Sequence, residues 1–150
     1  IYNDLATISM KIGEALSDRK QLEDALQYYE KGISIDKKYY GEIHPNIAAA
    51  YSHMSSVYSL MGRFEKAFDF IEKSLTLLQK IYRGKHPNIA TVIYNKGELY
   101  SKQKNYKEAV RYKEEGLNMY KELVPATHPS IKVMEADLEN NKKLLRGQTK

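Results

Sequence analysis

Cysteine is absent from this 150-residue chain, which excludes disulfides, thiol catalysis and cysteine-based zinc sites. Glycine (8 residues) and proline (4 residues) are scarce and do not cluster, so no flexible linker divides the sequence. No apolar run approaches the ~18 residues that a membrane-spanning helix needs, and no signal-like segment is present. We therefore expect a single domain over residues 1–150, a cytoplasmic location and no membrane partner.

A strong excess of one charge is also missing, because 24 Lys and Arg residues are mixed with 19 Asp and Glu residues, which leaves a mild net charge of +5. A nucleic-acid-binding domain usually concentrates its basic residues on one face. The basic residues near the C-terminus, Lys142, Lys143 and Arg146, fit a solvated helix end. Nucleic-acid binding is therefore kept only as an alternative.

The chain repeats itself every 42 residues. His-Pro-Asn-Ile-Ala occurs at His44–Ala48 and at His86–Ala90, and His-Pro-Ser-Ile-Lys follows at His128–Lys132. Residues of one kind recur at the same register: Ala25, Ala67, Ala109; Gly32, Ser74, Gly116; and Gly13, Ser55, Gly97. A period of this length indicates stacked units of two helices each.

The spacing of apolar residues at three and four positions predicts seven helices and no strand. Their expected ranges are 4–19, 21–39, 45–61, 64–82, 87–103, 106–123 and 129–146. Glycine inside a helix costs about 1 kcal/mol relative to alanine. Its repeated use at one register therefore indicates helices that pack too closely for a larger side chain.

These features resemble the tetratricopeptide repeat (TPR) family, and the 42-residue length with its His-Pro-x-Ile-Ala opening resembles the subtype found in kinesin light chains. The resemblance implies an all-α, right-handed α-solenoid with a concave groove lined by the first helix of each repeat. We expect repeats at about 2–43, 44–85 and 86–127, a capping helix at 129–146 and a tail at 147–150. The first repeat departs from the pattern, since Tyr2 and Asn3 stand where the others have His-Pro.

The register of the first helices predicts which residues face the groove. Tyr94 is the candidate anchor, because an exposed aromatic side chain can hold a ligand. A TPR subgroup grips chaperone C-termini with paired Lys and Asn residues, and of those only Asn95 is matched here, so that clamp is not expected. The candidate ligand-groove residues are Met10, Lys11, Glu14, Ser52, His53, Ser56, Tyr94, Asn95, Glu98, Lys102, Asp137 and Asn140.

No arrangement for catalysis, metal binding or a cofactor is found. A phosphate-binding glycine loop and a His-x-x-x-His pair are both missing from the sequence. His44, His86 and His128 occupy one register of successive repeats, roughly 10 Å apart by ordinary helix packing. Such histidines cannot share an ion, so we interpret them as structural. We expect no enzymatic activity, no small-molecule substrate and no cofactor.

The leading hypothesis is an adaptor or scaffold module that binds another protein, as a peptide or a helix, in its groove. Self-association into a homo-oligomer stays an alternative, because the first block is more acidic than the later ones and such blocks can meet head to tail.

Two lysines interrupt the apolar registers. Lys96 and Lys113 stand where the preceding block has Met54 and Ile71. A half-buried charge without a partner is costly. We therefore predict that Glu139 of the capping helix forms an ion pair with one of these lysines; the alternative is that both lysines extend to water past short neighbours.

The alanine register generates a first test, the substitution Ala67→Leu. If two helices meet at this alanine, the larger side chain should lower the free energy of unfolding by about 1–3 kcal/mol through overpacking. Urea denaturation measures the effect. A midpoint equal to that of the parent protein would show that the register does not mark a tight contact.

Overall fold

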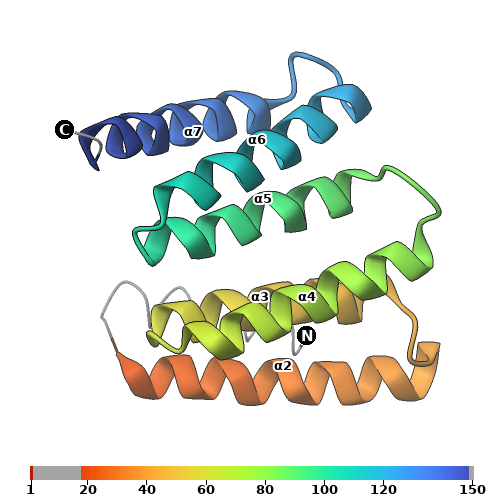
Figure 1. The fold of residues 1–150 in the computed structure, drawn as a ribbon. Helices are drawn as coiled ribbons and strands as arrows, with labels where there is room; N and C mark the ends of the chain where they lie inside the picture. The colour runs from red at the N-terminus through yellow and green to blue at the C-terminus, as the bar shows by residue number, and fades with distance from the viewer. Residues whose placement is uncertain (2–17, 149–150) are drawn as a thin grey trace. The chain divides into compact units, whose positions relative to one another are not determined.

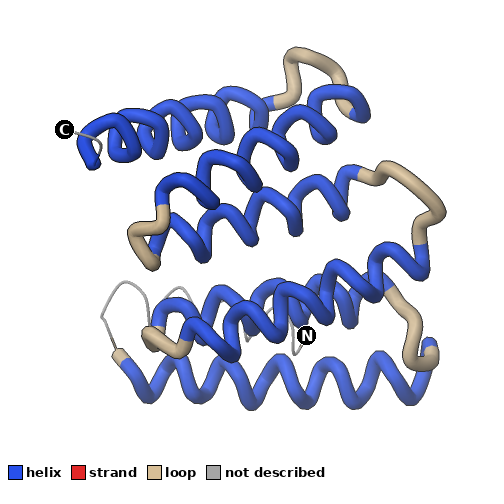
Figure 2. The backbone as a smooth tube through the Cα atoms, viewed as in Figure 1, coloured by secondary structure: helices blue, strands red, loops and turns tan. Residues whose placement is uncertain are grey.

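The computed structural model describes residue 1 and residues 18–148. These residues form six helices and no strand: α2 (Arg19–Tyr40), α3 (Pro45–Leu60), α4 (Phe64–Ile81), α5 (Pro87–Lys102), α6 (Tyr106–Leu123) and α7 (Pro129–Gln148) (Figures 1 and 2). The predicted helix at 4–19 lies almost wholly outside the described residues. The other six predicted helices are confirmed.

Helix boundaries agree with the predicted ranges to within two residues. The second predicted helix begins at Arg19 instead of residue 21, because the Asp18 side chain accepts a hydrogen bond from the backbone N–H of Lys20 at 2.9 Å. This N-cap satisfies a donor that a helix start leaves unpaired. At the other end of the chain, α7 continues two residues beyond the expected range, to Gln148.

The His-Pro pairs explain where three first helices begin. Nδ1 of His44, His86 and His128 accepts a hydrogen bond from the backbone N–H two residues later, at 3.2, 3.1 and 3.3 Å. The following proline fits the first helical position, where its missing N–H is not needed. Each histidine therefore caps its own helix, which confirms their structural interpretation.

The turn between the two helices of a repeat needs a left-handed residue. Gly62 adopts φ 72° between α3 and α4, and Lys104 adopts φ 60° at the same register between α5 and α6. Only glycine takes this conformation without steric cost. Gln148 Nε2 donates a hydrogen bond to the Lys104 carbonyl oxygen at 3.2 Å, which helps to hold the turn in the third repeat.

The chain forms two compact units, residues Ile1–Ile81 and residues Tyr82–Lys150. In unit 1, α3 and α4 pair as a hairpin, and α2 packs against α3. Two buried serines tie the hairpin together: Ser55 Oγ donates to the Ala67 carbonyl oxygen, and Ser74 Oγ donates to the Ala48 carbonyl oxygen, both at 2.7 Å. A side-chain hydroxyl this close to the opposite backbone shows that the helices nearly touch at both ends.

Unit 2 contains the hairpin of α5 and α6, with α7 packed on α6. Glycines take the places of the two serines. A Cβ added to Gly116 would lie 2.7 Å from both the Ala90 carbonyl oxygen and the Tyr94 backbone nitrogen, and one added to Gly97 would lie 2.7 Å from Lys113 Cγ. The core between α7 and the hairpin consists of Tyr94 and Leu117 of the hairpin with Ile131 and Leu138 of α7.

The histidine caps generate a test at His86, whose ring also stacks on Tyr82 with centroids 3.5 Å apart. His86→Ala should lower the free energy of unfolding of unit 2 by about 1 kcal/mol or more, since it removes the cap and the stack. His86→Asn keeps a cap acceptor and His86→Phe keeps only the aromatic ring. In urea denaturation, His86→Asn should be the more stable of these two; the reverse order would contradict the capping role.

Candidate functional site

In unit 1 the predicted groove residues divide into buried and exposed ones. Met10, Lys11 and Glu14 lie outside the described residues. Ser52 is buried, and Ser56 is half-buried with its Oγ 3.4 Å from the Ser52 carbonyl oxygen. His53 is exposed at one edge, while its ring stacks on Tyr29 at 5.6 Å. Although part of its surface is exposed, the imidazole is largely desolvated by neighbouring atoms, which lowers the pKa of His53, so the ring is neutral at pH 7.

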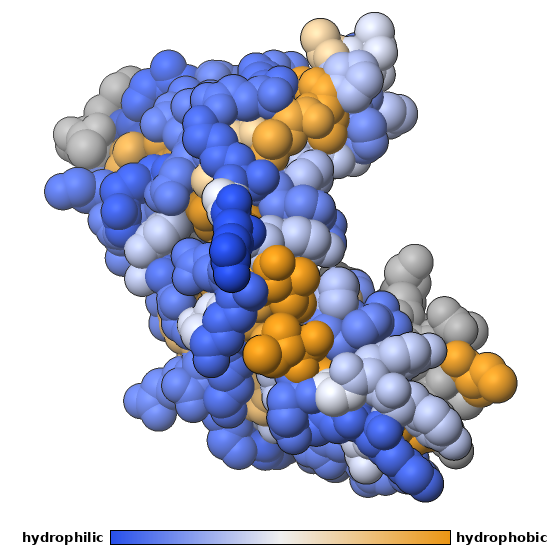
Figure 3. All heavy atoms as spheres, turned by 90° about the vertical axis from the view of Figure 1, so that its right-hand side faces the viewer, coloured by the Kyte–Doolittle hydropathy of each residue, from blue (hydrophilic) through white to orange (hydrophobic). Residues whose placement is uncertain are grey.

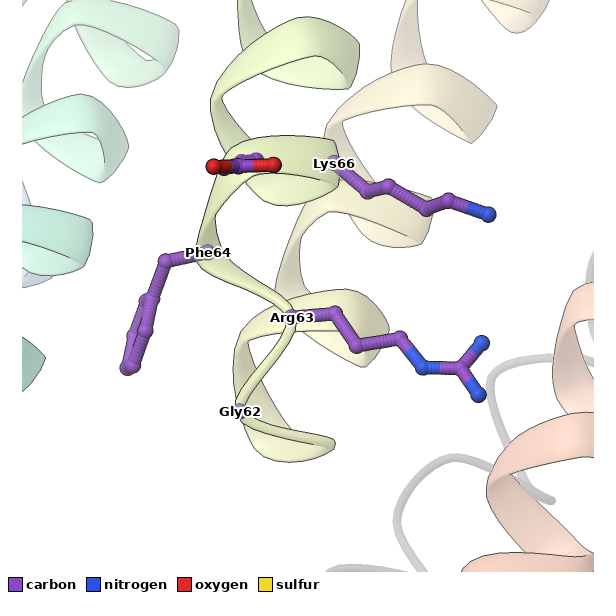
Figure 4. Close-up of a pocket in the computed structure, with 5 residues that line it drawn as sticks. Gly62, Arg63, Phe64 and Lys66 are labelled. Carbon is purple, nitrogen blue, oxygen red and sulfur yellow. The ribbon is translucent and has the colours of Figure 1, made fainter.

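A hollow lies beside the turn between α3 and α4, away from the predicted groove residues. It is lined by Gly62, Arg63, Phe64, Glu65 and Lys66. Figure 4 shows the Phe64 side chain pointing away from the side to which Arg63 and Lys66 both extend. These groups do not converge on one point, and none of them is a predicted groove residue.

In unit 2 the structure gathers three predicted groove residues around a buried cation. The Lys113 side chain of α6 is 0% exposed and forms ion pairs with Glu98 of α5 and with Asp137 of α7, the latter at 2.6 Å. The two carboxylates are 44% and 36% exposed, so they lie between the buried ammonium group and solvent. A buried charge is tolerated only when paired, and Lys113 has two partners.

Tyr94 belongs to this network and is not the exposed anchor predicted from the sequence. It is 9% exposed, and its hydroxyl oxygen lies 2.6 Å from Asp137 Oδ2 and 2.8 Å from the Met134 carbonyl oxygen. Burial, together with the hydrogen bond to Asp137, raises the pKa of Tyr94 far above its ordinary value. The phenol therefore stays protonated and can donate to α7.

Asn141 completes the network from the next turn of α7. Its Nδ2 donates to the Asp137 carbonyl oxygen at 2.9 Å and lies 3.3 Å from Asp137 Oδ1. Asp137 therefore meets a cation, a phenol and an amide at once. This combination fixes its carboxylate in one orientation.

The predicted partner of the lysines was wrong. Glu139 pairs with Arg146 at 2.8 Å on the exposed side of α7, while Lys113 is neutralised by Asp137 and Glu98. Lys96 places its ammonium group 4.6 Å from the centre of the Tyr112 ring, which is a cation–π distance. The expected compensation of Lys113 exists, but it uses carboxylates on another side of the helices.

The remaining predicted residues of unit 2 lie on the same two helices, α5 and α7. Lys102 and Asn140 are exposed, and Asn95 is half-buried. Val133 and Leu144 are exposed apolar side chains of α7. By helical spacing they lie on the same face of that helix as Asn140. On the face of the molecule drawn in Figure 3, hydrophilic residues predominate and apolar ones are confined to small separate areas.

Sequence reasoning missed the role of Asn141, and it identified Lys113 but assigned it the wrong carboxylate. For Lys113 the signal was present, because a lysine replaces Tyr29 and Ile71 at a buried register. Asn141 carries no comparable signal. Asparagine near the end of a helix is usually exposed. Asn141 is buried because it bonds to Asp137 one turn earlier in α7, and sequence alone does not reveal that contact.

The comparisons with known proteins identify the repeats. The family model for the tetratricopeptide repeat matches residues 4–80 and 46–122. The chain belongs to the tetratricopeptide repeat family. No curated protein matches the chain.

Solved structures show the same TPR fold. BtubC (BKLC) from P. vanneervenii is 17% identical, with a TM-score of 0.73 over 97% of this chain and 58% of its own. A kinesin light chain-type protein of Podosopora anserina, with nearly identical TPR-like repeats, is 19% identical with a TM-score of 0.71 over 99% of this chain and 69% of its own. A point-substituted form of the Podosopora anserina protein gives a TM-score of 0.69 and 19% identity over 95% of this chain and 66% of its own.

These matches confirm an all-α solenoid of TPR repeats similar to those of kinesin light chains. TPR repeats generally mediate protein–protein interaction and generally act as non-enzymatic scaffolds. Among the described helices, none is long and apolar enough to cross a membrane.

Proposed function

We propose that this TPR protein is an adaptor or scaffold module that binds a peptide or a helix along the surface lined by the first helices of its repeats. The observation that carries the proposal is the polar surface of α5 and α7 in unit 2, where Glu98, Lys102 and Asn140 are accessible. A cytoplasmic location and the absence of catalytic activity belong to the same proposal.

The network beneath this surface supports binding through preorganisation. Lys113 holds the Glu98 and Asp137 carboxylates from below, and Tyr94 and Asn141 further restrain Asp137. Side chains that are already ordered lose little conformational entropy when a partner binds. Fixed carboxylates next to the exposed Lys102 and Asn140 offer a partner a defined polar pattern.

The surface can be tested by affinity capture with the full chain, followed by mass spectrometry. The surface variant combines Lys102→Glu with Asn140→Arg. The control combines the same replacements at two exposed positions on the second helix α6, Lys107→Glu with Asn118→Arg. Light scattering on each variant checks that the oligomeric state is unchanged.

We expect the parent chain and the α6 control to capture the same proteins in similar amounts. The surface variant should capture at least about tenfold less of them, and a tenfold loss of affinity corresponds to about 1.4 kcal/mol. Undiminished capture by the surface variant would place the partner elsewhere on the protein. Equal loss from both variants would show that binding depends on overall charge.

A further inference from the structure

Lys113 is an exception within its own register. The equivalent residues of the two preceding repeats are Tyr29, which is 0% exposed, and Ile71, which is 1% exposed. Both pack as apolar core residues, whereas the third repeat buries an ammonium group at this place. Replacing an apolar side chain by a buried ion pair rarely adds stability, although it can add specificity.

The carboxylate opposite Lys113 is equally exceptional. Asp137 lies nine residues after His128, the N-cap of α7. The residues at the same distance from the caps of α3 and α5 are His53 and Asn95. Of the three helices that begin with His-Pro, only α7 offers an acid at this register.

The α5–α6 hairpin is shaped to receive that acid. Gly97 makes room for the lysine stem, since a Cβ there would lie 2.7 Å from Lys113 Cγ. Tyr94 adds a hydroxyl 2.6 Å from Asp137 Oδ2. A helix with asparagine or histidine at this place would leave the buried ammonium with Glu98 alone and would present no anionic acceptor to Tyr94.

We propose that the α5–α6 hairpin is a docking surface selective for a first helix with a carboxylate nine residues after its N-cap histidine, and that Lys113 makes this selection. The surface accepts α7 and rejects helices with the register of α3 or α5. A chain of similar repeats needs such a device, because its first helices share their opening motif and can pair in the wrong order or with a second copy. The inference is independent of the proposed peptide-binding function.

The test replaces Asp137 by the residues that α5 and α3 have at the same register. Each replacement is made in two versions of the full chain. Asp137→Asn reproduces the α5 residue and Asp137→His the α3 residue; each is made in the parent protein and in Lys113→Ile, which restores the residue type of the second repeat. Glu139→Gln, on the exposed side of α7, is the matched control. Native-state hydrogen exchange of the α7 amides measures docking, and the α5–α6 amides report whether the hairpin remains folded.

In the parent background, both Asp137 replacements should lower the protection of α7 by about 30-fold or more, because they leave a buried cation short of a partner. In the Lys113→Ile background, the same replacements should lower the protection of the α7 amides by less than about threefold, or raise it. The reason is that Asp137 has no cation to pair with once Lys113 is replaced. Glu139→Gln should have little effect in either background. Light scattering should detect oligomers of the parent-background Asp137 variants if a displaced α7 pairs with a second copy.

Equal losses of α7 protection in both backgrounds would overturn the inference, since Asp137 would then act through Tyr94 and Asn141 and not through Lys113. Unchanged protection in the parent background would also overturn it. The Asp137 variants can also lose protection of the α5–α6 amides. In that case, recovery of this protection in the Lys113→Ile background supports selection by Lys113, and continued loss contradicts it.

Discussion

The close approach of the two helices in the α3–α4 and α5–α6 hairpins is the constraint on which the other features depend. In unit 1 it is visible as two serine hydroxyls bonded directly to backbone carbonyls of the opposite helix, at Ala67 and Ala48. In unit 2 glycine is needed at both places, because a Cβ at Gly116 would meet the backbone of Ala90 and Tyr94 at 2.7 Å. Small residues therefore recur at two registers of a 42-residue period, despite the weak helix propensity of glycine and serine.

The same constraint creates the polar network of unit 2. Because Gly97 has no side chain, the Lys113 stem can pass close to α5 and bring its ammonium group between Glu98 and Asp137. The hairpin thus fixes α7 in place and holds two partly exposed carboxylates around the buried ammonium group. The geometry that holds the repeat together also positions the residues proposed for partner binding.

Much of the fold follows from the sequence because it depends on local and periodic features. The His-Pro motif sets three helix starts, and the alanine and small-residue registers mark the tight contacts. The partner of Lys113 could not be predicted in the same way. Asp137 and Glu139 are only two residues apart, yet about 200° apart around α7 by helix geometry, so an error of two positions in aligning α7 with the hairpin selects a carboxylate on the opposite side of the helix.

The burial of Tyr94 illustrates the same limit for the candidate site. Register alone places it with Met10 and Ser52 on a face expected to line the groove. Its burial comes from contacts with α7: the hydroxyl bonds to Met134 and Asp137, and the ring belongs to the core around Leu138. Lys102 of α5 and Asn140 of α7 are both exposed in the docked structure, so register predicts their accessibility where it fails for Tyr94.

Stability measurements on Gly116→Ala test the central claim most directly. Alanine normally stabilises a helix relative to glycine by up to about 1 kcal/mol, and Gly147→Ala, where a Cβ would meet nothing within 4 Å, provides that reference within the same chain. In urea denaturation, Gly116→Ala should instead lower the free energy of unfolding by about 1–3 kcal/mol, as overpacking does. An increase in stability like that of Gly147→Ala would contradict the close approach of the helices.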